Sequence, residues 1–239
     1  MKTALITGAN KGIGYETARQ LAQLGYFVYL GSRDKLNGKV AVEKLKALGL
    51  SNVTCIVIDV TIINSIKAAR IELESKIQQL DVLINNAGIA GEQPQNISTC
   101  SIENLREVFE TNFFGAVQTT QEFIDLLKKS DEPRIVNVSS QLASLAFHTT
   151  SQNPNHRIYD AYSCSKTALN SFTVMLAKEF AGTNFKINSV EPGYTATDLN
   201  NFEGLQTPEQ AAKNIVKYAT IDNQGATGKY FNKQGEMNW

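Results

Sequence analysis

The chain has 239 residues, and its 42% hydrophobic and 19% charged residues are typical of a soluble globular protein. Lys and Arg number 23 and so do Asp and Glu, which argues against a nucleic-acid or membrane partner because such binders carry a basic excess. No stretch approaches the roughly 20 apolar residues of a membrane span, and the three cysteines form no CxxC pair. A strand predicted from Thr3 leaves no room for a signal peptide, so we expect a cytoplasmic chain without disulfides or a metal site.

Short apolar runs alternate with longer segments of helical periodicity along the whole chain. Seven strands are predicted, at residues 3–7, 27–31, 54–58, 82–85, 134–139, 185–190 and 229–232. Six helices are predicted between them, at residues 15–24, 35–48, 62–78, 101–128, 160–181 and 208–218. This alternation predicts one Rossmann-type α/β domain over residues 1–239, a doubly wound fold whose seven-stranded, mostly parallel sheet has helices on both faces.

Polar residues and glycines follow six of the predicted strands directly. They are Gly8, Arg33, Asp59, Asn86, Ser140 and the pair Pro192-Gly193. Ligands of doubly wound sheets bind beyond the carboxyl ends of the strands, so we expect these residues to converge on one site.

The first turn is rich in glycine and lies between a strand and a helix. Glycines there let backbone N–H groups approach a pyrophosphate, and the helix N-terminus adds the positive end of its dipole. The residues predicted to bind the phosphates are Gly8, Asn10, Lys11, Gly12, Ile13 and Gly14. Their GxxxGxG spacing differs from GxGxxG, and an ordinary turn remains the alternative.

The second strand is expected to select the cofactor. NAD sites usually place Asp or Glu there, whereas this chain has Ser32 followed by Arg33, which can bind a 2′-phosphate through two hydrogen bonds. Lys11 adds a second cation, so the sequence predicts NADP(H), although Asp34 beside Arg33 opposes this. Asp59, with Val60 after it, is predicted to contact the adenine, and the alternative for Asp59 is the N-cap of the next helix.

Tyr162 and Lys166 stand at i and i+4, on one face of a predicted helix. A free phenol has a pKa of about 10, and an adjacent ammonium lowers it. Such a tyrosine can protonate a carbonyl oxygen as hydride reaches the carbon, while Ser140 holds the same oxygen. The pattern alone is weak, because this spacing also occurs on ordinary helix faces.

In these motifs the chain resembles the short-chain dehydrogenases/reductases. The matching segments are Thr7 to Gly14, Asn85 to Gly88, Asn112, Ser139-Ser140, Tyr162 to Lys166 and Pro192-Gly193. They occur in the family's order over nearly the whole chain. Three segments, Gly8 to Gly14, Thr111 to Gly115 and Glu236 to Trp239, are similar to the NADPH-dependent carbonyl reductases of this family. The resemblance implies an oxidoreductase that transfers hydride from NADPH to aldehydes and ketones.

The resemblance also implies catalytic roles. Tyr162 would be the acid/base, and Ser140, or alternatively Ser139, would orient the carbonyl. Lys166 would bind the nicotinamide ribose and lower the pKa of Tyr162. Asn112 would hold a water that links Lys166 to solvent, or would only distort its helix.

Further cofactor contacts are implied after the fourth and sixth strands. Asn86, Ala87 and Gly88 would line the adenosine ribose. The segment Pro192 to Thr197 would wrap the nicotinamide and pyrophosphate through Pro192, Gly193, Thr195 and Thr197, with the Thr195 backbone near the carboxamide.

Two departures from the family pattern concern the substrate. The segment between Ser140 and Tyr162 is longer than is common, and its extra part, residues 148–158, is predicted to be a loop at the mouth of the site. That loop could hinder the usual tetramer, so we expect a monomer or small homo-oligomer. The stretch from Asp198 to Gln206 is short for a lid, which predicts an open site for varied small carbonyl compounds, walled by residues 91–95, 141–159 and 194–206.

Two other functions stay open. An alcohol, sugar or hydroxyacyl dehydrogenase would use the same residues oxidatively. A non-catalytic NADP-binding sensor would be expected to lose Ser140, Tyr162 or Lys166, and this chain keeps all three.

Overall fold

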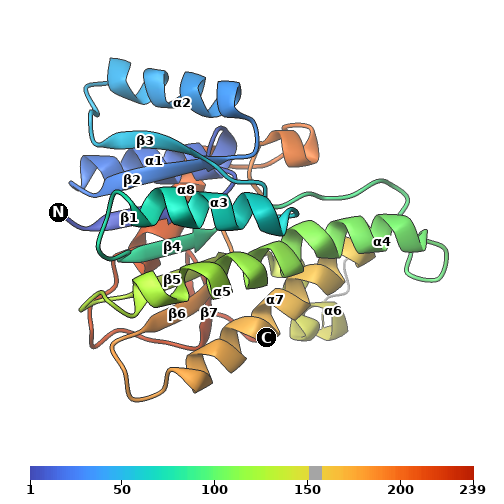
Figure 1. Ribbon diagram of the computed structural model, residues 1–239. Coiled ribbons are helices and arrows are strands. Elements are labelled where there is room, and N and C mark those ends of the chain that lie inside the picture. The colour runs from blue at the N-terminus through green and yellow to red at the C-terminus, as the bar shows by residue number, and fades with distance from the viewer. Residues whose placement is uncertain (151–157) are drawn as a thin grey trace.

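The strands form one sheet in which the first seven are parallel and the last is antiparallel (Figure 1). The structure is a computed structural model and describes residues 1–150 and 158–239. The strands are β1 (Thr3–Ile6), β2 (Phe27–Ser32), β3 (Val53–Val57), β4 (Val82–Asn85), β5 (Arg134–Val138), β6 (Lys186–Val190), β7 (Lys229–Asn232) and β8 (Gly235–Glu236). Their order, β3-β2-β1-β4-β5-β6-β7-β8, confirms the doubly wound fold.

The prediction of seven strands is wrong, because the sheet has an eighth, short strand, β8. Gly235 and Glu236 pair with the end of β7 after a tight turn, in which the Asn232 side chain accepts hydrogen bonds from the Gln234 and Gly235 N–H groups. A strand of two residues is too short for an alternating pattern, so periodicity could not reveal it.

Helices cover both faces of the sheet (Figure 1). The longer helices are α1 (Gly12–Gln23), α2 (Lys35–Ala47), α3 (Ile63–Glu74), α4 (Ile102–Phe109), α5 (Gly115–Leu127), α7 (Asp160–Glu179) and α8 (Pro208–Ala219). Side chains of α1, α2 and α8 pack in one apolar core, and those of α3, α5 and α7 pack in a second core on the other face. Because both faces of the sheet are buried, a ligand can reach the strands only at their ends.

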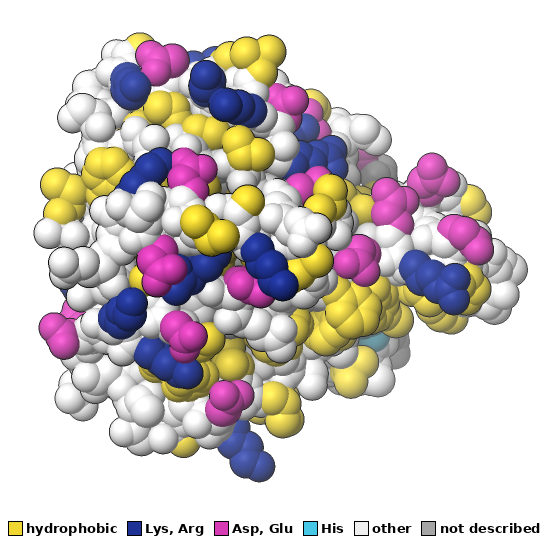
Figure 2. All heavy atoms as spheres, in the orientation of Figure 1, with side chains coloured by type: hydrophobic (Ala, Val, Ile, Leu, Met, Phe, Trp, Pro, Cys, Tyr) yellow, Lys and Arg dark blue, Asp and Glu magenta, His cyan; other side chains and the backbone are white. Residues whose placement is uncertain are grey.

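The surface carries charges of both signs. Figure 2 shows Lys and Arg side chains interspersed with Asp and Glu over one face of the molecule. None of the described helices is long and apolar enough to cross a membrane.

The long helix predicted over residues 101–128 is interrupted in its middle. Ser101 caps it as expected, because its side chain accepts a hydrogen bond from the Asn104 N–H at 3.1 Å. Residues Glu110–Phe114 then form a π-helical segment between α4 and α5. Such a segment widens the helix by one residue per turn and is frequent at functional sites. It contains Asn112, so the interruption concerns a predicted site residue.

The segment between Ser140 and Tyr162 is only partly the loop that we predicted. Residues Leu145–Thr150 form the helix α6, which overlaps the start of the predicted 148–158 loop. Ser144 begins it by accepting a hydrogen bond from the Phe147 N–H, and the Ala146 N–H donates to the carbonyl of Trp239 at 3.0 Å. The chain end therefore supports this helix. The rest of the predicted loop, residues 151–157, lies outside the described residues.

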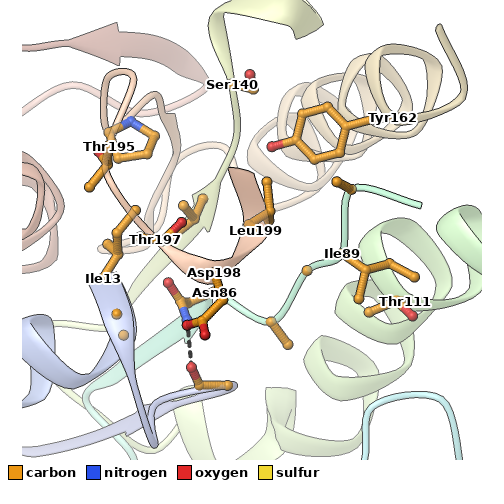
Figure 3. A pocket seen from close by; sticks show the side chains of 18 of the residues that line it. Ile13, Asn86, Ile89, Thr111, Ser140, Tyr162, Thr195, Thr197, Asp198 and Leu199 are labelled. Carbon is orange, nitrogen blue, oxygen red and sulfur yellow. Dashed lines mark hydrogen bonds between the residues drawn. The ribbon is translucent and has the colours of Figure 1, made fainter. Parts of the chain in front are cut away.

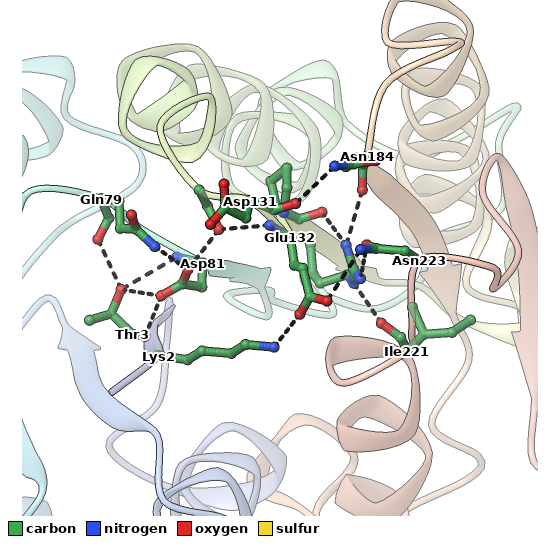
Figure 4. Close-up of polar contacts among 12 residues, drawn as sticks. Lys2, Thr3, Gln79, Asp81, Asp131, Glu132, Asn184, Ile221 and Asn223 are labelled. Carbon is green, nitrogen blue, oxygen red and sulfur yellow. Dashed lines mark hydrogen bonds and ion pairs between the residues drawn. The ribbon is translucent and has the colours of Figure 1, made fainter.

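A buried polar network connects the amino ends of the strands (Figure 4). The Asp81 carboxylate, just before β4, accepts hydrogen bonds from the Thr3 N–H, the Gln79 amide and the Ser130 hydroxyl at 2.7, 2.8 and 2.6 Å. Arg134, the first residue of β5, donates to the carbonyls of Pro133, Asn184 and Ile221. These bonds tie β1, β4 and β5 to the loops before β6 and β7.

Asp81→Asn should destabilise the fold. The new amide nitrogen would face donors where a carboxylate oxygen now accepts, which costs about 3 kcal/mol of the free energy of unfolding. Urea unfolding measures this, with Asp125→Asn as the control because Asp125 makes an exposed ion pair with Lys128. Equal stability of the two variants would contradict the role given to the Asp81 network.

Candidate active site

A cavity of about 970 Å³ opens at the carboxyl ends of the parallel strands (Figure 3). Almost every residue predicted for the site lines it. These are Gly8, Asn10, Lys11, Gly12, Ile13, Gly14, Arg33, Asp59, Val60, Asn86, Ala87, Gly88, Ser140, Tyr162, Lys166, Pro192, Gly193, Thr195 and Thr197. Asn112 is the exception. The topology thus brings the ends of six strands to one cavity, as expected for this fold.

The glycine turn is shaped by its neighbours after β4. Gly8 has a φ of +61°, and a Cβ at Gly14 would lie 2.5 Å from the Asn86 side-chain nitrogen and 2.6 Å from the Gly8 carbonyl. The Asn86 side chain itself donates to the carbonyls of Thr7 and Gly8 at 2.9 and 3.0 Å. Asn86 therefore holds the turn in place besides lining the cavity.

The N-terminus of α1 faces the cavity without a capping side chain. Lys11 is the N-cap residue and its side chain makes no cap hydrogen bond, and no acidic residue lies in the first turn. The first N–H groups of a helix have no partner within the helix, and here Gly12, Ile13 and Gly14 line the cavity. This end of α1 therefore fits an anionic group such as a phosphate.

Two cations, Lys11 and Arg33, line the cofactor end of the cavity. Asp34 is the N-cap of α2, where its side chain accepts from the Asn37 N–H at 2.7 Å, so its carboxylate is committed to the helix. Arg33 is exposed and lines the cavity. Lys11 forms an exposed ion pair with Asp198 at 3.2 Å across the cavity mouth.

Asp59 does not cap the helix after β3. Its carboxylate accepts from the Thr61 N–H and hydroxyl at 3.0 and 2.7 Å, whereas the N-cap residue of α3 is Ile62. The N-cap alternative is therefore wrong, and Asp59 stays at the cavity wall beside Val60.

Ser140 and Tyr162 meet across the cavity. Tyr162 reaches in from α7, Ser140 lies just beyond the end of β5 (Figure 3), and Ser140 lowers the pKa of the phenol. Ser139 instead is buried and donates to the Asn170 side chain at 2.7 Å. Of the two serines, the geometry favours Ser140 as the partner of the tyrosine.

Burial governs the protonation of Tyr162 and Lys166. Loss of hydration raises the pKa of Tyr162 to about 12, and the hydrogen bond from Ser140 opposes this rise. Burial lowers the pKa of Lys166 to about 8, and its ammonium donates to the Val138 carbonyl at 2.8 Å. The Lys166 nitrogen lies 5.8 Å from the centre of the Tyr162 ring. The pKa of Tyr162 therefore moves in the opposite direction to the one expected from Lys166.

Asn112 lies behind the cavity wall rather than on it. Its side chain exchanges two hydrogen bonds with the backbone of Ile89, at 2.8 and 2.9 Å, and donates to the Ser165 hydroxyl at 3.0 Å. A Cβ at Gly88 would lie 3.2 Å from its oxygen and 3.4 Å from the Lys166 nitrogen. Asn112 therefore fastens the wall against which Lys166 packs.

The segment after β6 closes one side of the cavity. Gly193 has a φ of +92°, which only glycine adopts readily, and Gln206 donates to the Thr195 hydroxyl at 3.1 Å. Thr197 begins a short 3₁₀ turn, Asp198–Asn200, through a capping box with Asn200. Residues from all three segments predicted to wall the site line the cavity, among them Gly91, Gln141, Leu142, Phe147, Tyr159, Tyr194 and Leu199.

Two residues at the site were not found from the sequence. Tyr230 on β7 is fully buried and its hydroxyl donates to the Ser140 carbonyl, which fixes the backbone of that residue. Glu191, between β6 and Pro192, lines the cavity. Tyr230 gave no signal because it lies far along the chain from Ser140. Glu191 could have been found, because its carboxyl group directly follows a predicted strand and precedes the Pro192-Gly193 pair.

Comparison with known proteins identifies the family. The profile of the short chain dehydrogenase family matches residues 2–207. The chain belongs to the short-chain dehydrogenase family. The predicted resemblance is therefore confirmed.

Other members of the short-chain dehydrogenase family match nearly the whole chain. A (+)-neomenthol dehydrogenase from Capsicum annuum is 32% identical over 298 residues, covering 95% of this chain and 94% of the relative. A salutaridine reductase from Papaver bracteatum is 30% identical, covering 97% and 94%. The structure of NADPH-bound carbonyl reductase from chicken fatty liver matches with a TM-score of 0.86 and 27% identity, covering 100% of this chain and 99% of that one.

Gly14→Ala should disrupt the glycine turn. The new Cβ would lie under 3 Å from the Asn86 side chain and from backbone, so the turn must shift, at a cost of about 2 kcal/mol in the free energy of unfolding. Gly88→Ala is the matched control in the same cavity, because its closest contact would be 3.2 Å. Denaturant unfolding of both variants compares them, and a smaller loss for Gly14→Ala would contradict this account.

Proposed function

We propose that this protein is an NADPH-dependent carbonyl reductase that converts aldehydes and ketones to alcohols. The observation that carries the proposal is the meeting of Ser140, Tyr162 and Lys166 in one cavity with a glycine turn and an exposed arginine. The family membership and the reductases among the relatives support it.

The residues at the far end of the cavity fit NADP(H). The uncapped N-terminus of α1 and the glycine turn suit a pyrophosphate. Arg33 and Lys11 would hold the 2′-phosphate, and one oxygen of the Asp34 carboxylate is bonded to the N-terminus of α2. When bound there, the cofactor supplies the hydride for reduction.

Tyr162 would act as the acid. A phenol with a pKa near 12 stays protonated at neutral pH, so it can donate its proton to the carbonyl oxygen as that oxygen gains charge. The Ser140 hydroxyl would donate a second hydrogen bond to the same oxygen and orient it. Both groups lie on the wall of one cavity, so a carbonyl would bind between them.

Lys166 would support Tyr162 and position the ribose. Its ammonium is held by the Val138 carbonyl, and Asn112 fastens the wall at Gly88 beside it. A positive charge near the phenol stabilises the phenolate left after proton donation. Asn112 thus acts as a positioning residue, and the water that we expected it to hold stays a prediction.

The site would accept carbonyl compounds of varied size. Its outer walls carry the apolar and aromatic side chains of Leu142, Phe147, Tyr159 and Leu199. The alignment with the neomenthol dehydrogenase runs over 298 residues, more than the 239 of this chain, so that relative has internal segments that this chain lacks.

The oxidative alternative uses the same residues, with the Tyr162 phenolate accepting the hydroxyl proton. We favour reduction because Arg33 lines the cofactor end of the cavity and a salutaridine reductase and a carbonyl reductase are among the similar proteins. The sensor alternative does not account for Ser140, Tyr162 and Lys166 lining the same cavity.

Tyr162→Phe should abolish most of the activity. Removing the hydroxyl takes away the proton donor, so NADPH oxidation with a panel of activated ketones should fall about 100-fold or more in kcat. Tyr159→Phe is the matched control, since it lines the same cavity with its ring centre 6.5 Å from that of Tyr162. Full activity of Tyr162→Phe would exclude the proposed acid.

Arg33→Ser should weaken NADPH binding. Loss of charge-assisted hydrogen bonds to a 2′-phosphate should raise the Kd for NADPH about 10- to 100-fold and leave that for NADH nearly unchanged. Isothermal titration measures both constants. Lys35→Ser is the control, because Lys35 is a neighbouring cation that does not line the cavity. An equal loss for both nucleotides would show that Arg33 does not select NADP(H).

The reduction rate should fall as the pH rises through about 8. Lysine carries its charge below its pKa, and burial lowers that of Lys166 to about 8, so the ammonium is present at pH 6 and lost by about pH 9. A kcat profile from pH 6 to 10 measures this limb. Lys166→Arg should shift the limb upward, because arginine stays charged. A profile flat to pH 10 in the unaltered chain would contradict the role of Lys166.

A further inference from the structure

A buried tyrosine on β7 reaches the backbone of Ser140, which precedes it by 90 residues in the chain. Tyr230 pairs with Ser189 of β6 in the parallel register, and Ser189 pairs with Asn137 of β5. The three side chains share one face of the sheet, because residues in register point to the same side. From that face the Tyr230 hydroxyl donates a hydrogen bond to the Ser140 carbonyl, just beyond the end of β5. Tyr230 is fully buried, so this bond is shielded from water.

The polar groups of Ser140 are also engaged in the turn that follows β5. The Ser140 carbonyl accepts from the Ala143 N–H at 2.8 Å, and its hydroxyl oxygen accepts from the Leu142 N–H at 3.2 Å. A hydroxyl that accepts one hydrogen bond still has its proton to donate to another group. Because the backbone carries this hydroxyl, the Tyr230 bond, which comes from outside the turn, constrains where the proton points.

The indole of Trp239 supports the Tyr230 ring. The two rings stack with centres 5.5 Å apart and planes 18° apart, and the Met237 N–H donates to the Tyr230 carbonyl at 2.8 Å. Trp239 is 38% exposed, whereas Tyr230 has no exposed surface. The indole therefore shields the tyrosine from solvent, and the stacking restricts the tilt of the phenol ring.

The same segment holds the wall beside Ser140. The Asn238 carbonyl accepts from the Ser144 hydroxyl at 2.8 Å, and the Trp239 carbonyl accepts from the Ala146 N–H at 3.0 Å. These donors lie at the start of α6, which places Phe147 on the cavity wall. Residues 230–239 thus fix both the serine that would contact the substrate and the wall next to it.

We propose that Tyr230 is a positioning residue that acts on carbonyl reduction through Ser140, and that Trp239 supports it. This inference rests on the proposed function. In the reduction, the carbonyl carbon gains a hydride and its oxygen gains the Tyr162 proton, while the Ser140 hydroxyl donates a hydrogen bond to that oxygen. Negative charge develops on the oxygen in the transition state, so a misdirected hydroxyl lowers kcat more than it weakens substrate binding. Tyr230 does not line the cavity, so its effect must pass through Ser140.

Tyr230→Phe separates this role from plain core packing. Phenylalanine keeps the ring and its stack on Trp239, and it removes only the donor to Ser140. The Ser140 carbonyl keeps its bond from the Ala143 N–H, so the variant should fold. We expect kcat for ketone reduction with NADPH to fall about tenfold, with the ketone KM and the Kd for NADPH nearly unchanged. A kcat equal to that of the unaltered chain would overturn the proposal.

A double-mutant cycle tests the route through Ser140. Ser140→Ala alone should lower kcat about 100-fold, because it removes a donor to the developing charge. In the Ser140→Ala background, Tyr230→Phe should cause little further loss, since the hydroxyl that it positions is gone. Tyr218→Phe is the matched control and should leave kcat unchanged, because Tyr218 is also buried but stacks on Phe231, the next residue of β7. A second tenfold loss from Tyr230→Phe in the Ser140→Ala background would overturn this route.

Variants of Trp239 test the support of the phenol ring. Trp239→Ala should lower kcat several-fold, and Trp239→Phe, which keeps a ring to stack on Tyr230, should restore most of that loss. In the Ser140→Ala background, Trp239→Ala should cause little further loss. If Trp239→Ala has the kcat of the unaltered chain, Trp239 does not support Tyr230 as we propose.

The Ser140 carbonyl reports the contact without any need for turnover. Labelling with ¹³C-carbonyl serine and ¹⁵N glutamine selects the Ser-Gln pairs of the chain, Ser140-Gln141 and Ser151-Gln152, and the first is assigned by its loss in Ser140→Ala. A carbonyl carbon signal moves upfield when its oxygen loses a hydrogen bond, so we expect that change in Tyr230→Phe and none in Tyr218→Phe. An unmoved signal in Tyr230→Phe would overturn the positioning of Ser140. Absence of turnover in the unaltered chain would instead defeat the proposed function, and the carbonyl signal would still decide whether Tyr230 holds Ser140.

Discussion

The shared direction of seven strands is the constraint on which the site depends. Because β1 to β7 are parallel, all their carboxyl ends meet at one edge, and residues as distant as Gly8 and Pro192 line the same cavity. The opposite edge is closed by the network around Asp81 and Arg134, which ties strand starts to loops. The amino ends of the strands thus hold the sheet together, and the carboxyl ends form the site. Changes at Asp81 are expected to act on stability, and changes at Tyr162 on catalysis.

Burial is the physical cause of most of the chemistry at the catalytic end. It raises the pKa of Tyr162 and lowers that of Lys166, so it favours the uncharged form of both side chains. Helix α7 supplies both, and the π-helical segment between α4 and α5 brings Asn112 against the wall beside Lys166. A regular helix would turn Asn112 by a different angle, so the interruption of the helix is part of the site.

The two ends of the cavity differ in the charged groups that line them. At the cofactor end, the uncapped start of α1, Arg33 and Lys11 favour an anion. At the catalytic end, the Glu191 carboxyl group lines the cavity and accepts a hydrogen bond from the Gly193 N–H. This polarity separates binding from proton transfer along one cavity. It also explains why a chain with no net charge can hold an anionic ligand.

The sequence by itself determined the fold class, the family and most of the cavity lining, because periodicity and strand-end motifs are local signals. The glycine turn, Asn86, Ser140, Tyr162 and Lys166 could all be read from their order along the chain. The eighth strand, the helix α6 and the π-helical segment could not, since each is too short for periodicity or depends on packing. Tertiary structure alone decided that Ser139 is buried, that Asp59 caps no helix, and that Glu191 and Tyr230 stand beside Ser140 and Tyr162. These facts depend on contacts between distant strands, and burial, which sets the pKa of Tyr162, exists only once those contacts form.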